Sequence, residues 1–194
     1  CMDAPLGDHI GCNAEDNEVL EILRGEKKND LSRLSLFHAA KILQAAEGIG
    51  EEEAVSRAAN AIDSGAAIRK FGEIIAAQGG YAGDVYKTLP MSDTVHTLRA
   101  KEDGYVRISA LALGRACAAL GGGRAKEGDA IDHGAGILLK VRQGARVKKG
   151  AVLAEAYCSK SGEEGFALAE SAFAFSPKKI KDRPLVYAFI GGKE

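Results

Sequence analysis

The chain has 194 residues, of which 46% are hydrophobic and 27% are charged, and its formal net charge at pH 7 is −1. A chain of this length and composition can bury a core, which argues against disorder, and its balanced charge disfavours nucleic acid or an anionic membrane as a partner. No apolar run approaches the roughly 20 residues of a membrane-spanning helix. The four cysteines form no Cys-X-X-Cys pair, so we expect a cytoplasmic protein. The chain begins at Cys1 in a loop-like stretch, and we expect it to be a piece of a longer polypeptide.

The first 80 residues have the apolar period of successive helices. Polar starts and glycine stops, such as Asp30 and Gly48, mark the ends of these helices. The predicted helices cover residues 13–24, 30–47, 51–64 and 68–78. The second has the broadest apolar face, so we expect it to be largely buried with His38 packed inside, and in the third we expect Val55 to face inward. Short links predict antiparallel packing of these helices on another element.

After residue 90 the apolar pattern changes to one typical of strands. Strands are predicted at residues 95–100, 105–108, 137–141, 152–157 and 185–190, and helices at 109–120 and 163–175. Turn signals such as Asp103-Gly104 and Lys149-Gly150 separate the strands. We therefore predict an α+β fold in two parts, residues 1–90 and residues 91–194.

Two motifs in the second part suggest ligand binding. Gly121-Gly122-Gly123-Arg124 could hold a phosphate, but it follows a helix and lacks the lysine and hydroxyl of a P-loop, so we interpret it as a structural turn. Residues 144–153 resemble the turn-strand-turn unit of biotinyl and lipoyl domains, and the spacing places Lys160 where those domains carry their modified lysine. Ser159 and Ser161 stand where the biotin pattern has methionines. We therefore favour an unmodified Lys160 and keep a non-catalytic carrier or binding module as the alternative.

Histidine and cysteine side chains give weaker signals. His9 and Cys12 have a spacing suited to two zinc ligands, but zinc takes three or four and no second pair is close in sequence. His96 on a predicted strand and Asp132-His133 before another are candidate acid–base groups. No nucleophile accompanies them, so we interpret them as structural polar residues and predict no catalytic residue in this chain.

Several short motifs occur in an order that resembles one enzyme family. They are MDAPLG at residues 2–7, AAQGG at 76–80, LP at 89–90, AKEDGYV at 100–106, ALG at 112–114, LGGGR at 120–124 and IDH at 131–133. Together with Gly11 and Glu18, they resemble the pyrimidine-nucleoside phosphorylase and thymidine phosphorylase family over nearly the whole chain.

The resemblance implies a cytoplasmic, homodimeric pentosyltransferase without an organic cofactor. Phosphate attacks the glycosidic carbon of a pyrimidine nucleoside and releases the free base and a pentose 1-phosphate; thymidine, uridine and nucleoside monophosphates stay open as substrates. It also implies an α/β parent in which the helices of residues 1–90 cover a sheet and residues 91–194 form a barrel-like α/β hammerhead domain. The family's phosphate loop and base-binding residues precede the MDAPLG loop. We therefore expect this chain to be the C-terminal half, inactive alone, and to self-associate through uncovered apolar faces.

A monovalent cation, potassium, is also implied by the resemblance. Its ligands in this chain would be the backbone carbonyls of Leu6 and His9 and the carboxylate of Glu18, with others from the phosphate loop. Carbonyls three residues apart in a turn can converge, and a carboxylate is a hard oxygen donor that suits an alkali cation. The alternative is that Glu18 is a solvated carboxylate on a short helix. In the chain alone we expect this site to be empty or hydrated.

Overall fold

The computed structural model describes residues 4–124, 126–159, 162–181 and 183–190. Its contacts divide the chain into two compact units. One consists of residues 17–88, here called the helical unit, and the other of residues 1–16 with residues 89–194, here called the sheet unit. The two predicted domains, residues 1–90 and residues 91–194, stay a prediction. Within the described residues, no helix is both long and apolar enough to cross a membrane.

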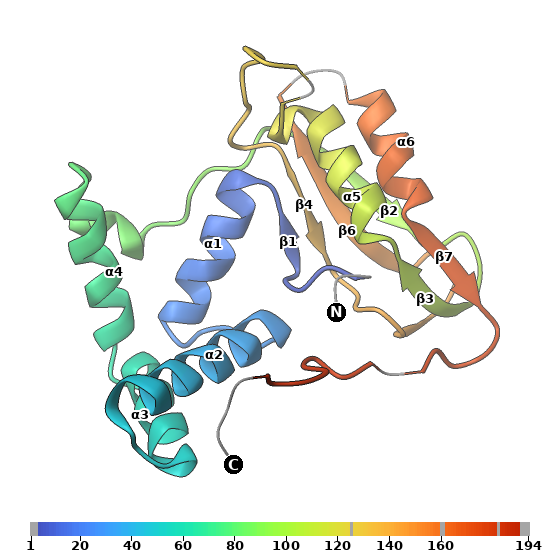
Figure 1. Cartoon of the computed structure of the whole chain (residues 1–194). Helices are drawn as coiled ribbons and strands as arrows, with labels where there is room; N and C mark the ends of the chain where they lie inside the picture. The colour runs from blue at the N-terminus through green and yellow to red at the C-terminus, as the bar shows by residue number, and fades with distance from the viewer. Residues whose placement is uncertain (1–3, 125, 160–161, 182, 191–194) are drawn as a thin grey trace. The chain divides into compact units, whose positions relative to one another are not determined.

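The four helices predicted for the first 80 residues are confirmed (Figure 1). They are α1 (Cys12–Leu23), α2 (Asp30–Glu47), α3 (Glu51–Asp63) and α4 (Ala66–Ala77), followed by a short 3₁₀ turn, η1 (Ala82–Tyr86). The N-cap of α2 is Asn29, one residue before the predicted cap, and its side chain accepts a hydrogen bond from the backbone N–H of Ser32. Gly48 ends α2 with a φ of 67°, which favours glycine.

The helical unit covers its apolar side chains less completely than the sequence predicts. Its core consists of Leu20, Ile68 and Val85, with Leu23, Phe71 and Ile75 packed against them. In α2, Ser32 and Ala40 are buried, whereas Ile42 is 66% exposed and His38 is exposed. Val55 of α3 is 50% exposed as well. The predictions for α2, His38 and Val55 are therefore wrong in this structure, because periodicity marks the apolar face of a helix but not whether another element covers it.

The described residues of the sheet unit form two open antiparallel sheets. The first has the order β1-β4-β6-β2, and the second has the order β5-β3-β7. The strands are β1 (His9–Ile10), β2 (Thr94–Arg99), β3 (Gly104–Ile108), β4 (Gly136–Leu139), β5 (Arg146–Val147), β6 (Val152–Cys158) and β7 (Phe173–Ser176). The predicted α+β class is confirmed, but the barrel-like arrangement is not, because both sheets are open.

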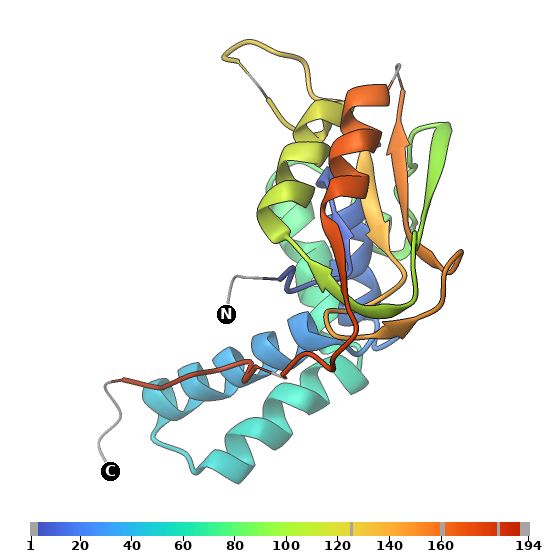
Figure 2. The same cartoon turned by 90° about the vertical axis from the view of Figure 1, so that its right-hand side faces the viewer.

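Two helices lie side by side against the strands of the sheet unit, as both views show (Figures 1 and 2). They are α5 (Ala110–Cys117), which continues into a π turn, η2 (Ala118–Gly122), and α6 (Glu163–Ser171). The core of the sheet unit lies between these helices and the strands. Its buried side chains include Leu98, Val106, Leu113, Ile137 and Leu153.

The end of the chain departs from the prediction at two places. The predicted helix 163–175 stops at Ser171, and Phe173–Ser176 forms β7 beside β3. The strand predicted at 185–190 is wrong, because residues 183–190 have no regular structure and Ile190 is 92% exposed. A strand needs a partner for its backbone groups, and the sequence shows only its propensity.

Candidate functional site

Glu18 of α1 is the centre of a buried polar cluster in the helical unit. Its side chain is 1% exposed, and its Oε1 accepts a hydrogen bond of 2.7 Å from Nδ2 of Asn29. The same oxygen lies 2.9 Å from Nζ of Lys27, which is also 3.7 Å from Oε2 of Glu21. Asn29 and Ser32 form a capping box at the start of α2. The carboxylate is therefore not solvated, and the cluster joins α1 to the start of α2.

Leu6 and His9, the other two predicted cation ligands, belong to the sheet unit, whereas Glu18 belongs to the helical unit. Leu6 precedes β1, and His9 pairs with Leu138 of β4. The Nδ1 atom of His9 lies 2.9 Å from the carbonyl oxygen of Ala14. The cation site of these three residues stays a prediction.

The zinc interpretation of His9 and Cys12 finds no support in the structure. In the part of the chain that the structure describes, no three His, Cys, Asp or Glu side chains group as metal ligands. Cys12 starts α1, and the thiols of Cys12 and Cys117 are free. Burial raises the pKa of the Cys117 thiol to about 11, which disfavours the reactive thiolate at neutral pH.

Asp132 joins three loops of the sheet unit. Its carboxylate accepts hydrogen bonds from Oγ of Ser92 at 2.9 Å, from the backbone N–H of Gly134 at 3.0 Å, and from both N–H and Oγ of Ser159. Burial raises the pKa of Asp132, but the hydrogen bonds from Ser159, Ser92 and Gly134 outweigh it and hold this pKa below its ordinary value. These donors keep the carboxylate charged, and the interpretation of Asp132 as a structural polar residue stays a prediction.

The glycine-rich segment 121–124 is a turn whose backbone contacts other parts of the sheet unit. Gly121 has a φ of 101°, and its carbonyl accepts the backbone N–H of Asp132 at 2.9 Å. A Cβ on Gly122 would lie 2.7 Å from Sγ of Cys117 and 2.9 Å from the carbonyl oxygen of Ala135. These contacts support the interpretation as a structural turn.

His96, the other acid–base candidate, is partnered at the surface of the sheet unit. Its ring stacks on Phe166 with ring centroids 4.7 Å apart, and its Nε2 is 3.4 Å from Oε1 of Glu170. Lys101, at 3.0 Å, and His96 hold the pKa of Glu170 below its ordinary value despite partial burial. His133 is exposed. The structure thus gives His96 two partners, Phe166 and Glu170, and leaves the side chain of His133 exposed.

The segment 144–153 has the turn-strand-turn geometry that its sequence indicates. Gly144 and Gly150 have φ values of 81° and 86°, and β5 lies between them. Lys160, the candidate for modification, lies outside the described residues. The carrier alternative therefore stays untested.

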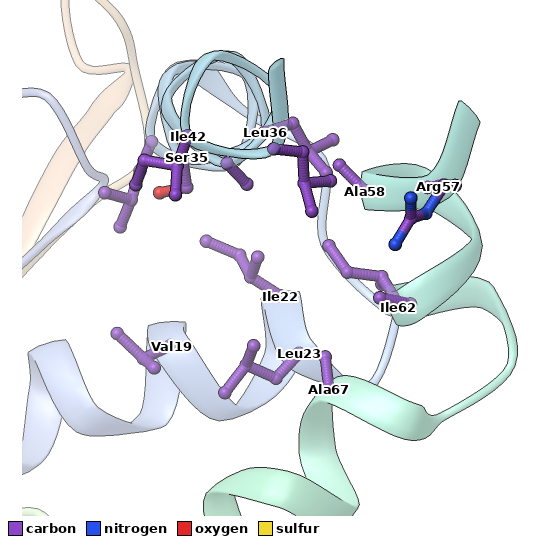
Figure 3. Close-up of a pocket in the computed structure, with 14 residues that line it drawn as sticks. Val19, Ile22, Leu23, Ser35, Leu36, Ile42, Arg57, Ala58, Ile62 and Ala67 are labelled. Carbon is purple, nitrogen blue, oxygen red and sulfur yellow. The ribbon is translucent and has the colours of Figure 1, made fainter. Parts of the chain in front are cut away.

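An apolar pocket of about 600 Å³ lies among α1, α2, α3 and the start of α4 in the helical unit (Figure 3). Val19 of α1 and Ile42 of α2 are among the apolar side chains that line it. Of its lining residues Arg57 alone is charged, and its guanidinium donates to both oxygens of Glu47 at 2.6 and 3.0 Å. This lining suits apolar groups and is unlike a site for phosphate.

Comparison with known proteins identifies the sheet unit. The family model described as "Pyrimidine nucleoside phosphorylase C-terminal domain" matches residues 105–175. The match begins in β3 and ends in β7, where Val106 pairs with Phe175, so it covers a segment whose two ends are neighbouring strands. This chain corresponds to the C-terminal region of the pyrimidine-nucleoside phosphorylase family.

Curated relatives cover more of the chain than the family model. A pyrimidine-nucleoside phosphorylase from Geobacillus stearothermophilus is 37% identical over 82% of this chain and 38% of its own length. A thymidine phosphorylase from Mycobacterium tuberculosis is 34% identical over 94% of this chain and 40% of its own length. An AMP phosphorylase from Thermofilum pendens is 33% identical over 83% of this chain and 30% of its own length. The chain thus spans about two fifths of the first two relatives and less of the third.

The sequence analysis missed the partners of Glu18. Lys27 and Asn29 follow the stop of α1 at Gly25, where a positive φ of 78° turns the chain back. The position of Asn29 could have been predicted from the sequence, because asparagine before a helix is a preferred N-cap. Nothing in the sequence indicated that Lys27 would pair with Glu18, because a lysine in a loop is usually solvated.

Proposed function

We propose that this chain is the C-terminal part of an enzyme that converts a pyrimidine nucleoside and phosphate into a free base and a pentose 1-phosphate. The observation that carries the proposal is the match of residues 105–175 to the phosphorylase C-terminal domain. The relatives named as pyrimidine-nucleoside and thymidine phosphorylases, which align with 82% and 94% of the chain, support it. A cytoplasmic homodimer with a barrel-like hammerhead domain belongs to the same proposal.

We further propose that the described residues supply scaffold rather than chemistry. Phosphorolysis needs positive groups that hold phosphate and donors that stabilise the departing base. Two positive groups of the described residues are engaged in ion pairs within the protein: Arg57 with Glu47 and Lys101 with Glu170. The reacting groups would then come from the three fifths of the relatives' length that this chain does not cover.

The scaffold proposal is tested by incubating the purified chain with phosphate and either thymidine or uridine and measuring free base by chromatography. We expect no release, with the Geobacillus stearothermophilus enzyme as the positive control. Turnover within a few tenfold of the typical enzyme value of about 10 per second would contradict the scaffold proposal.

A chimera tests the family function directly. The aligned C-terminal region of the Geobacillus stearothermophilus enzyme is replaced by this chain, and phosphorolysis is measured after circular dichroism has confirmed folding. We expect activity on a pyrimidine nucleoside; a folded but inactive chimera would count against the proposal. Intact mass after coexpression with a biotin or lipoate ligase tests the alternative, because a carrier would show an adduct on Lys160.

A further inference from the structure

Glu18 is the one charged residue among the buried polar side chains of the described chain; the others are Asn17, Asn29 and Ser32. A carboxylate removed from water destabilises the fold unless a countercharge and hydrogen-bond donors compensate for its lost hydration. The phosphorylase resemblance implies that a potassium ion supplies this charge. Whether the residues present fit such an ion can be tested on the surroundings of the carboxylate.

Oε1 of Glu18 already has a positive partner and a hydrogen-bond donor. The ammonium of Lys27 lies 2.9 Å away, and the amide Nδ2 of Asn29 donates at 2.7 Å. Both groups present hydrogens to the oxygen, and an ammonium has no lone pair with which to ligate a metal. A potassium ion bound to the same oxygen would lie against a fixed positive charge, so these residues do not fit an added cation.

The position of Lys27 makes its ammonium a built-in countercharge. The side chain is 20% exposed, so the aliphatic stem is largely covered, and the ammonium also lies 3.7 Å from the carboxylate of Glu21, one helical turn after Glu18. Asn29 is fixed in turn by its capping box with Ser32. The lysine therefore faces two carboxylates of α1 from a loop that the start of α2 holds in place.

We propose that the ammonium of Lys27 takes the place of the monovalent cation at Glu18, so that an internal ion pair and not potassium neutralises this buried carboxylate. The inference rests on the contacts of the helical unit and is independent of the reaction proposed above. Its consequence is that the stability of this unit does not depend on potassium.

The test compares the thermal unfolding of the wild-type chain, Lys27→Met and Lys28→Met in potassium chloride and in choline chloride at equal ionic strength. Methionine keeps most of the lysine stem and removes the charge. Lys28 is the neighbouring exposed lysine, so Lys28→Met controls for the change in net charge. We expect the wild type and Lys28→Met to have the same Tm in both salts within about 1 °C. Lys27→Met should lose about 5 °C or more in choline and regain part of it as potassium is titrated.

Two results would overturn the proposal. A saturable, potassium-specific rise in the Tm of the wild-type chain would show that the ion binds beside Lys27. A folded Lys27→Met protein without any potassium response would show that the ammonium does not stand in for the ion. Should Lys27→Met not fold, the double variant Glu18→Gln/Lys27→Met removes both charges; it should fold and be insensitive to potassium, and its failure to fold would also overturn the proposal.

Discussion

Replacing Asp132 by asparagine should destabilise the sheet unit, because the carboxylate accepts hydrogen bonds from its own turn and from two other loops, at Ser92 and Ser159. Both of its oxygens are acceptors: Oδ1 receives the N–H of Gly134 at 3.0 Å, and Oδ2 receives the N–H of Ser159 at 3.0 Å. Asparagine has one oxygen, so one of these backbone donors would face an NH₂ group. A hydrogen bond to a charged group contributes about 1.5–3 kcal/mol, and water can reach exposed Ser159, so we expect a loss of about 1–2 kcal/mol.

The pH dependence of this loss follows from the lowered pKa of Asp132. A carboxyl group whose pKa is lower in the folded state contributes stability that is complete above the unfolded pKa, about 3.9. That contribution disappears as the pH falls through the folded pKa. The difference in stability between the wild type and Asp132→Asn should therefore be constant above about pH 5 and shrink below about pH 4.

Native-state hydrogen exchange of the β4 and β6 amides measures this difference, because it reports the opening of the sheet unit separately from the helical unit. Asp129→Asn is the control: this exposed carboxylate accepts one backbone N–H, from Lys126 at 2.8 Å, and its replacement should cost less than about 0.5 kcal/mol. An Asp132→Asn protein as stable as the wild type at pH 7, or equally destabilised at pH 7 and pH 3.5, would refute the reasoning.

Three further substitutions probe the packing and capping of the sheet unit by urea unfolding. Gly136→Ala should lower the free energy of unfolding by about 1–3 kcal/mol, because its Cβ would lie 2.5 Å from the backbone oxygen of Ile10 in β1; an unchanged midpoint would contradict this close approach. Gly114→Ala lies within α5 with nothing within 4 Å of the added Cβ, so it should stabilise the chain by about 0.5–1 kcal/mol, and a loss of stability would argue against the helix there. Ser109→Ala removes the side-chain cap on the N–H of Ala112 and should cost about 1 kcal/mol, whereas Ser109→Asp should retain most of that stability.

The sequence alone was sufficient for elements whose signals are local. The helix from Asp30 to Glu47 is preceded by an asparagine cap and followed by a glycine with positive φ, and both signals act within one or two turns. The strands at 94–99 and 152–158 lie within a residue of their predicted bounds because each has enough length to show its apolar pattern. The ordered motifs likewise indicate the phosphorylase family without any information on tertiary contacts.

Features that depend on distant partners were decided by the tertiary structure. The sequence pattern predicts the end of a helix at Phe173–Ser176, but this segment forms β7. Its backbone groups pair with those of β3, which lies some 70 residues earlier in the chain. Residues 185–190 have strand propensity but no regular structure, and β1 and β5 are too short, at two residues each, to have a period.

For Glu18, too, the sequence determined some properties and the tertiary structure determined others. Its place on α1 followed from the apolar pattern, and its role as a cation ligand was implied by the family motifs. Its burial and its pairing with Lys27 depend on how the loop after Gly25 returns to α1. Sequence patterns determine which groups a segment carries and which face is apolar. Only the folded chain determines which charge lies beside which, because Coulomb and hydrogen-bond energies depend on distances that sequence separation does not fix.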